Sequence, residues 1–159
     1  MDPAEGATVI TVAELMSTKV KTLQAGATLA DVYQLMRASG IRHVPIVDTA
    51  GALLGIVSYQ DIMAATPTRF DQESRREVAY SHSRASDIMT TDVATVSVQT
   101  SARQAAQAMQ KRKIGCLPVL DGARLVGIVT AADFLGLAAR LMAESEKAEA
   151  ATMLRDTGH

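Results

Sequence analysis

Two seven-residue stretches of the chain place a hydroxyl residue three positions before a carboxylate. They read GIVSYQD, which ends at Asp61, and GIVTAAD, which ends at Asp133. A hydroxyl group can donate to a phosphate oxygen, and an ionised carboxylate accepts the paired hydroxyl donors of a ribose. The same spacing is that of a capping box, which satisfies the first backbone N–H groups of a helix. Ser58 with Asp61 and Thr130 with Asp133 are therefore ribose-phosphate ligands or helix caps, and spacing alone does not choose.

Few other residues have types and spacing that favour catalysis or metal binding. The three histidines, His43, His82 and His159, are dispersed in the sequence, which argues against a histidine metal centre. The single cysteine, Cys116, excludes an internal disulfide and lies in an apolar stretch, where a buried, unreactive thiol is expected. No nucleophile–base pair is visible, so we predict that the chain is not an enzyme.

The two hydroxyl–carboxylate motifs follow apolar runs of the kind that form strands covered on both faces. These runs are LLGIVS at residues 53–58 and LVGIVT at residues 125–130, and a helix is expected after each. A second pair of apolar strands precedes them, VPIV at residues 44–47 and LPVL at residues 117–120. Each carries a proline, which has no backbone N–H group and therefore predicts a sheet edge or the start of a strand.

An earlier helix is predicted in each half of the chain. Thr28 and Ser101 are its N-caps, because an acidic or amide residue stands three positions on and apolar residues follow at helical spacing. Short strands are predicted just before these helices, at residues 20–23 and 93–96. The order of elements in each half is therefore β-α-β-β-α.

This order occurs twice because the chain is an internal repeat. The segment from Val12 aligns with the segment from Ala85, and the offset shortens by one residue where DTAGAL is matched by DGARL in a turn. One repeat alone offers little core, so we expect an α/β (α+β) fold in which two repeats pack as a pseudo-twofold pair. The predicted divisions are a lead-in at 1–11, repeats at 12–66 and 85–139, a polar, partly helical linker at 67–84, and a helix extension with a tail at 140–159.

The two repeats differ in the cations that a phosphate would need. Arg42 and His43 are the candidates beside the first hydroxyl–carboxylate pair, whereas the matching positions of the second repeat hold Gly115 and Cys116. The basic run that ends at Lys113 lies just upstream, although three adjacent charges are more often a solvated helix end. We therefore predict two unequal sites.

Composition limits the class of protein. The chain has 159 residues, of which 48% are hydrophobic and 21% charged, so it has material for one packed core and little sign of disorder. A formal net charge of −1 argues against a nucleic-acid partner. No apolar run reaches the length of a membrane span, and the N-terminus lacks a signal pattern. We expect a cytoplasmic protein without a membrane partner.

The order, spacing and duplication of these motifs resemble a tandem pair of CBS domains, named after cystathionine β-synthase. The residues that carry the resemblance are GIRHVPIVD followed by GIVSYQD, and KIGCLPVLD followed by GIVTAAD, within a span from Val12 to Ala139. The resemblance implies a disc-like, usually dimeric module with ligand clefts between its repeats. It also implies an adenine nucleotide as ligand, or in some members S-adenosylmethionine, NAD or Mg²⁺.

The resemblance also implies which residues line the clefts. One cleft of a CBS pair often draws on both repeats, and the residue pair before the proline faces the phosphate. Thr22 and Thr95 are then the candidates for the base end, largely through backbone groups. The implied ligand-binding residues are Val20, Thr22, Ile41, Arg42, His43, Pro45, Ser58, Asp61, Val93, Thr95, Lys113, Cys116, Pro118, Thr130 and Asp133.

Two functions follow as alternatives. In the first, the chain is a stand-alone regulatory module that binds AMP, ADP or ATP, with Mg²⁺ as an accompanying ion and no covalent cofactor, and signals to an unidentified protein. A sensor of S-adenosylmethionine or NAD is a variant of this function. In the second, the chain is a ligand-free dimerisation scaffold, and Asp61 and Asp133 serve only as helix caps.

Overall fold

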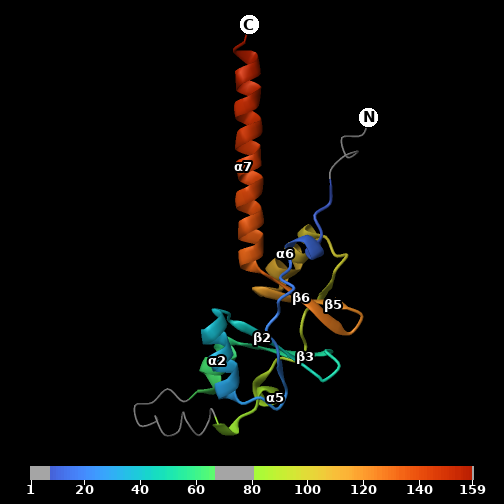
Figure 1. Cartoon of the computed structure of the whole chain (residues 1–159), viewed down its shortest axis with the longest axis vertical. Helices are drawn as coiled ribbons and strands as arrows, with labels where there is room; N and C mark the ends of the chain where they lie inside the picture. Colours follow the sequence, from blue (N-terminus) through green and yellow to red (C-terminus); the bar gives the residue numbers. More distant parts are fainter. Residues whose placement is uncertain (1–7, 67–80, 159) are drawn as a thin grey trace.

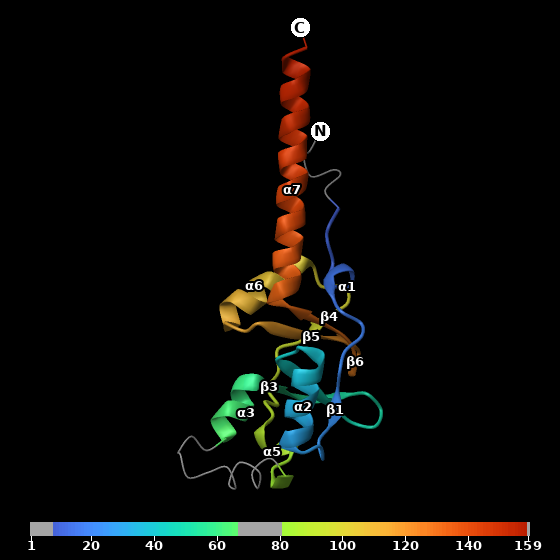
Figure 2. The ribbon, with the colours of Figure 1, turned by 60° about the vertical axis from the view of Figure 1, so that its left-hand side comes forward.

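The structure is a computed structural model that describes residues 8–66 and 81–158. Two three-stranded sheets, each accompanied by helices, form two halves that lie one above the other (Figures 1 and 2). The first half contains β1 (Leu23–Gln24), α2 (Leu29–Ser39), β2 (His43–Val47), β3 (Leu53–Ser58) and α3 (Tyr59–Ala65). The second half contains β4 (Val96–Ser97), α6 (Ala102–Arg112), β5 (Cys116–Asp121), β6 (Arg124–Thr130) and α7 (Ala131–Asp156). The predicted duplicated β-α-β-β-α order is confirmed.

Each sheet has the same topology. In the first half β2 is the central strand, parallel to β1 and antiparallel to β3, and in the second half β5 has the same place between β4 and β6. The predicted position of the prolines at a sheet edge or strand start is therefore wrong, since Pro45 and Pro118 are the third residues of the central strands. The strands tolerate them because β1 pairs only with Ile46 and Val47, which leaves Pro45 without a neighbouring strand on that side.

The first strand of each half is shorter and later than predicted. β1 and β4 have two residues each and begin where the predicted strands at 20–23 and 93–96 were to end. The segments at 17–21 and 90–94, which lie shortly before them, belong to no named helix or strand and contribute to the clefts described below. The predicted N-caps are confirmed: Thr28 Oγ1 and Ser101 Oγ each accept a hydrogen bond of 3.1 Å from the backbone N–H group three residues on.

The two halves exchange one-turn helices. α1 (Val12–Leu15) belongs to the first repeat in sequence, yet Val12 is completely buried in the core of the second half. α5 (Ala85–Ile88) belongs to the second repeat, and Ala85 is buried in the core of the first half. Backbone hydrogen bonds fix both helices, from Val12 N to Thr100 O at 2.8 Å and from Ala85 N to Ala27 O at 2.7 Å. Each core is therefore complete only when both repeats are present.

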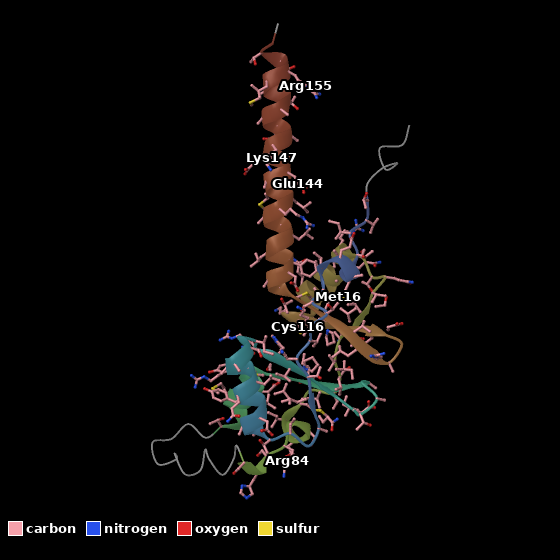
Figure 3. All side chains as sticks on the ribbon, in the orientation of Figure 1. Met16, Arg84, Cys116, Glu144, Lys147 and Arg155 are labelled. Atoms are coloured by element: carbon pink, nitrogen blue, oxygen red, sulfur yellow. The ribbon has the colours of Figure 1, made fainter. Side chains whose placement is uncertain are left out.

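The glycine of each GIV motif lies where the segment after the exchanged helix pairs with the edge strand of the other half, as the bridges Ile56–Thr90 and Ser17–Ile128 show. A Cβ atom at Gly55 would lie 2.7 Å from the carbonyl oxygen of Thr90 and 2.8 Å from the sulfur of Met89. A Cβ atom at Gly127 would collide with the sulfur of Met16, which Figure 3 shows at the junction with the second half. The repeated glycines and methionines thus fit the two halves together.

The last helix differs most between the halves. α7 has 26 residues, against seven in α3, and at 1.5 Å per residue it is about 39 Å long. Residues 139–158 are all exposed, and the helix projects away from the two halves (Figure 1), with Glu144, Lys147 and Arg155 along it (Figure 3). No described helix combines the length and apolarity needed to cross a bilayer. Most of the predicted linker, residues 67–80, lies outside the described residues.

Candidate functional site

Two related clefts lie between the halves of the molecule. The first, called cleft A, has a volume of about 620 Å³ and is formed by the Ser58–Asp61 joint, residues 90–94 before β4, and residues 112–116. The second, called cleft B, has a volume of about 420 Å³ and is formed by the Thr130–Asp133 joint, residues 17–21 before β1, and residues 40–43. Each cleft therefore takes its joint from one repeat and its facing segment from the other, as the resemblance implies. Both volumes are in the range of small-ligand pockets.

The hydroxyl–carboxylate pairs cap helices in this structure. At the first joint Ser58 Oγ accepts from Asp61 N at 3.1 Å, and Asp61 Oδ2 accepts from Ser58 N at 2.7 Å. At the second joint Asp133 Oδ2 accepts from Thr130 N at 2.8 Å and lies 3.4 Å from the Thr130 hydroxyl oxygen. Capping and ligand binding are compatible, because the caps use Oδ2, and no described residue donates to Oδ1 of Asp61 or Asp133.

The structure brings most of the predicted site residues to the clefts. His43 lines both clefts, and its backbone lies beside Ser58 in the sheet. The other predicted residues in cleft A are Ser58, Asp61, Val93, Lys113 and Cys116. The other predicted residues in cleft B are Val20, Ile41, Arg42, Thr130 and Asp133.

Four predicted residues line neither cleft. Pro45 and Pro118 are completely buried inside the central strands, so they cannot contact a ligand there. Thr22 and Thr95 come one residue after Lys21 and Ala94, which do line the clefts, at the point where the chain turns away to form β1 or β4. The facing segments that line the clefts therefore end one residue before the two predicted threonines.

The sequence interpretation missed the charged residues of the facing segments. Lys19 and Lys21 line cleft B, whereas Asp92 and Ala94 hold the matching positions in cleft A. The signal was present in the repeat alignment, because these positions flank Val20 and Val93 and differ in charge between the copies. Cleft B thus has three cations and one carboxylate, which are Lys19, Lys21, Arg42 and Asp133. Cleft A has two cations, Arg112 and Lys113, and two carboxylates, Asp61 and Asp92.

The expected role of Arg42 beside Ser58 and Asp61 implied that it lines cleft A. The structure does not place it there. Arg42 lines cleft B and a third cavity of about 490 Å³, called the side pocket, which shares His43, Ser58 and Lys113 with cleft A. Its guanidinium carbon lies 5.3 Å from the centre of the Tyr59 ring, a cation–π contact that holds the side chain.

The residues at matching positions before the prolines have different chemistry. Burial lowers the pKa of His43; the charge of Asp61 acts against this shift and that of Arg42 adds to it. Burial, followed by the charge of Asp133, raises the pKa of the Cys116 thiol to about 12. Cys116, seen between the halves in Figure 3, therefore stays neutral, whereas His43 is a titratable group in the lining of the same cleft A.

No group of three or more metal-ligating side chains gathers anywhere in residues 8–66 and 81–158. The carboxylates that could contact a cation carried by a ligand are Asp61 and Asp92 in cleft A and Asp133 in cleft B.

Comparison with known proteins gives the same architecture. The CBS domain profile matches residues 12–67 and 85–140. A CBS domain-containing protein of Dictyostelium discoideum is 33% identical over 137 residues, which cover 84% of this chain and 94% of that protein. A homoserine O-acetyltransferase of Methanococcoides burtonii is 34% identical over 123 residues, but this match spans only 23% of the enzyme.

Solved structures extend the comparison. A protein assigned to acetoin utilization (AcuB) in Vibrio cholerae has a TM-score of 0.75 and 40% identity, covering 88% of this chain and 98% of the other. The CBS domain pair of protein MJ0100, solved with 5′-methylthioadenosine and S-adenosyl-L-methionine, has a TM-score of 0.69 and 27% identity, with 87% and 99% covered. The cytosolic domain of the Mg²⁺ channel MgtE, solved with ATP, has a TM-score of 0.65 and 27% identity, with 80% and 48% covered. The duplicated sequence, the exchanged helices and the two cross-repeat clefts are thus those of a tandem pair of CBS domains, and the chain belongs to the CBS domain family.

Proposed function

We propose that this CBS pair is a regulatory module that binds an adenine nucleotide in cleft A. The observation that carries the proposal is the chemical division of that cleft between a hydroxyl–carboxylate joint and a facing wall from the other repeat. Asp61 Oδ1 is available to accept from the two ribose hydroxyls, and the Ser58 hydroxyl can donate to the first phosphate. The ligands in the solved structures of MJ0100 and MgtE, all adenosine compounds, support this choice.

Cleft A also has an apolar part that suits a purine base. Ile56, Val93 and Ile114 contribute it. A nucleotide of roughly 23 heavy atoms at about −0.3 kcal/mol per atom binds with a Kd on the order of 10 μM. That affinity suits the sensing of a metabolite.

Titration calorimetry of the nucleotide-free protein tests this proposal. AMP, ADP, ATP and S-adenosylmethionine are titrated into the native protein and into Asp61→Asn and Asp133→Asn, because asparagine keeps the capping acceptor but loses the charge. We expect micromolar binding that Asp61→Asn weakens at least tenfold. If none of the four compounds binds while the protein remains folded, the sensor function is wrong.

Binding in a cleft built from both repeats gives a physical route to regulation. A ligand that contacts the Ser58–Asp61 joint and residues 90–94 together stabilises one relative position of the repeats. We infer that this position is read by a separate protein and that the chain itself catalyses no reaction. We place the protein in the cytoplasm, where adenine nucleotides are abundant, and expect Mg²⁺ to accompany the more highly phosphorylated ligands.

The exposed face of α7 supports a homodimer and, with it, the alternative function of a scaffold. Leu135, Met142, Met153 and Leu154 on this helix are 65–75% exposed. Sedimentation equilibrium of the native protein and of Met153→Lys/Leu154→Lys tests the role of the helix. A native dimer that becomes monomeric in the double variant supports pairing through α7, whereas two identical masses contradict it.

A further inference from the structure

Two tyrosines form a stacked pair on the helices of the first half. The rings of Tyr33 on α2 and Tyr59 at the start of α3 have centres 6.5 Å apart and an interplanar angle of 27°. Arg37 lies over the first ring, 5.8 Å from its centre, and Arg42 lies over the second at 5.3 Å. These four side chains, called the tyrosine ridge, support one another through stacking and cation–π contacts. Both rings are half-buried, so the ridge presents a preformed aromatic surface to solvent.

The second half lacks every side chain of the ridge. In the repeat alignment both rings are replaced by alanine, and the two arginines are replaced by a neutral amide and a glycine. The residues that match Arg37, Tyr33, Tyr59 and Arg42 are Gln110, Ala106, Ala131 and Gly115, in that order. The two halves therefore share one backbone plan and differ in bulk and charge at the same four places.

A hollow lies at these positions of the second half. It has a volume of about 480 Å³ between α6 and the start of α7, and Ala106, Gln110 and Ala131 line it. Ile114 and Phe134 supply much of its apolar wall, and its described lining contains no charged side chain. Figure 2 shows α3 on the same side of the molecule as α6, so a single partner can reach the helices of both halves. An exposed apolar hollow favours a partner that removes it from water.

We propose that a second copy of the chain inserts its tyrosine ridge into this hollow, so that two chains pair antiparallel, with the first half of each against the second half of the other. The inference rests on the homodimer proposed above and assigns the surfaces that form it. Twofold symmetry repeats the contact, so a dimer buries two ridges in two hollows. A stable dimer buries roughly 800 Å² per partner, and both a ridge and a hollow of each copy contribute to that area. Tyrosine and arginine are also enriched among the residues that carry most of the binding energy of interfaces.

Charge and shape both disfavour a parallel pair, in which like halves meet. Ridge against ridge sets Arg37 and Arg42 against the same two cations of the other copy. Hollow against hollow leaves apolar walls without contacting atoms. In the antiparallel pair the arginines meet a hollow whose described lining is uncharged, and the helix that continues from it carries three glutamates and one lysine at residues 144–149. The cations at residues 111–113 lie outside the lining of the hollow.

Moving a ring from one half to the other tests this pairing. Sedimentation equilibrium of the full chain measures the dimer dissociation constant. Tyr33→Ala shortens the ridge and Ala106→Tyr fills the hollow, so each should raise that constant at least about tenfold. Tyr33→Ala/Ala106→Tyr returns a ring and a space to every contact with their sides exchanged, so we expect recovery to within about threefold of the native value. Leu54→Ala, at an exposed apolar residue of β3, is the control and should change the constant by less than about twofold.

Cross-linking tests the direction of pairing in chains that keep the ridge. Met63 on α3 and Leu135 on α7 occupy matching positions beside the ridge and the hollow, and they are 36% and 72% exposed. Met63→Cys and Leu135→Cys are made in a Cys116→Ala background, carry different tags, and are mixed before reaction with a short bismaleimide. Antiparallel pairing should join position 63 to position 135 in clear excess over either position to itself. Leu54→Cys measures the background of random collisions.

The outcomes separate the arrangement from the dimer itself. Recovery in the double variant, together with cross-links between positions 63 and 135, establishes the antiparallel pair. Losses that add in the double variant, or cross-links that join each position to itself, overturn the antiparallel pair and leave the homodimer intact. A chain that stays monomeric at every concentration overturns the homodimer as well, whereas nucleotide binding in cleft A is judged by the calorimetry alone.

Discussion

Clefts A and B have the same backbone plan and different charges. Both combine a hydroxyl–carboxylate joint with the segment before the first strand of the other repeat. The joints retain their acidic cap, since Asp61 and Asp133 accept from the backbone of Ser58 and Thr130 at 2.7 and 2.8 Å. The charged residues that line the cleft walls have diverged. Cleft B has more cations than carboxylates, whereas cleft A has equal numbers of the two.

This difference shows which parts of the repeat are fixed by folding. A cap satisfies backbone N–H groups that every copy of the helix must satisfy, so its loss destabilises the fold wherever it occurs. The wall residues Lys19, Lys21 and Arg42 are exposed, and exposed positions change with little effect on stability. The cleft walls are therefore where ligand preference can differ between the copies.

The largest effect is expected where the segment after each exchanged helix pairs with the edge strand of the other half. Gly55→Ala places a methyl group against the fixed carbonyl oxygen of Thr90, so we expect a loss of about 2–3 kcal/mol in the free energy of unfolding. Gly127→Ala meets chiefly the flexible end of Met16, and Ser17 O lies 3.2 Å away, so its loss should be smaller. Urea unfolding measures the loss in free energy for both variants. Equal losses would show that the neighbours of Gly55 and Gly127 are equally rigid.

The next effect tests the charges of the walls. With cleft A weakened by Asp61→Asn, Lys19→Asp should lower the affinity of cleft B for an anionic ligand about fivefold to tenfold, because a nearby cation is replaced by an anion. With cleft B weakened by Asp133→Asn, Asp92→Lys should raise the affinity of cleft A by a similar factor. Calorimetry with ATP at low and high salt measures both. Lys147→Asp on α7 is the control, and unchanged affinities in the wall variants would mean that the walls do not contact the ligand.

A smaller effect is the pH dependence that His43 gives to the stability of the fold. Its pKa is lower in the folded state than its usual value of 6.5, so the unfolded chain binds more protons just below pH 6.5. The contribution of His43 to stability is therefore present above pH 6.5 and is lost as the pH falls through the folded-state pKa. We expect His43→Gln to reduce the fall in Tm between pH 7 and pH 5 by about 1–3 °C. Parallel Tm profiles for the two proteins would contradict this assignment.

The smallest effect concerns the thiol at the matching position of the second half. With a pKa of about 12, about one Cys116 side chain in 10⁴ is ionised at pH 8. We therefore expect no modification by iodoacetamide during an hour at pH 8. His43→Cys puts a thiol at the half-buried position of the first half and should take up one equivalent. Mass spectrometry counts the labels, and rapid labelling of the native protein would show that Cys116 opens to solvent.

The sequence was informative wherever a local rule decides the structure. Thr28 and Ser101 cap their helices because the caps depend on residues only three positions apart. The position of Pro45 was predicted wrongly because a proline fits a central strand when the neighbouring strand does not reach it. β1 is only two residues long and ends its pairing at Ile46 and Val47. Lys19 and Asp92 were missed because apolar patterning does not show which exposed side chains face a cleft across the repeat boundary.

The exchange of α1 and α5 makes the chain suitable for fragment complementation. A break between Thr66 and Ser81 would leave each fragment with a helix that completes the core of the other, so neither fragment has a full core alone. Reassociation would restore both cores and both clefts in one step. The two fragments could then be fused to separate proteins as a split reporter, in which a bound ligand would strengthen the reassembled state.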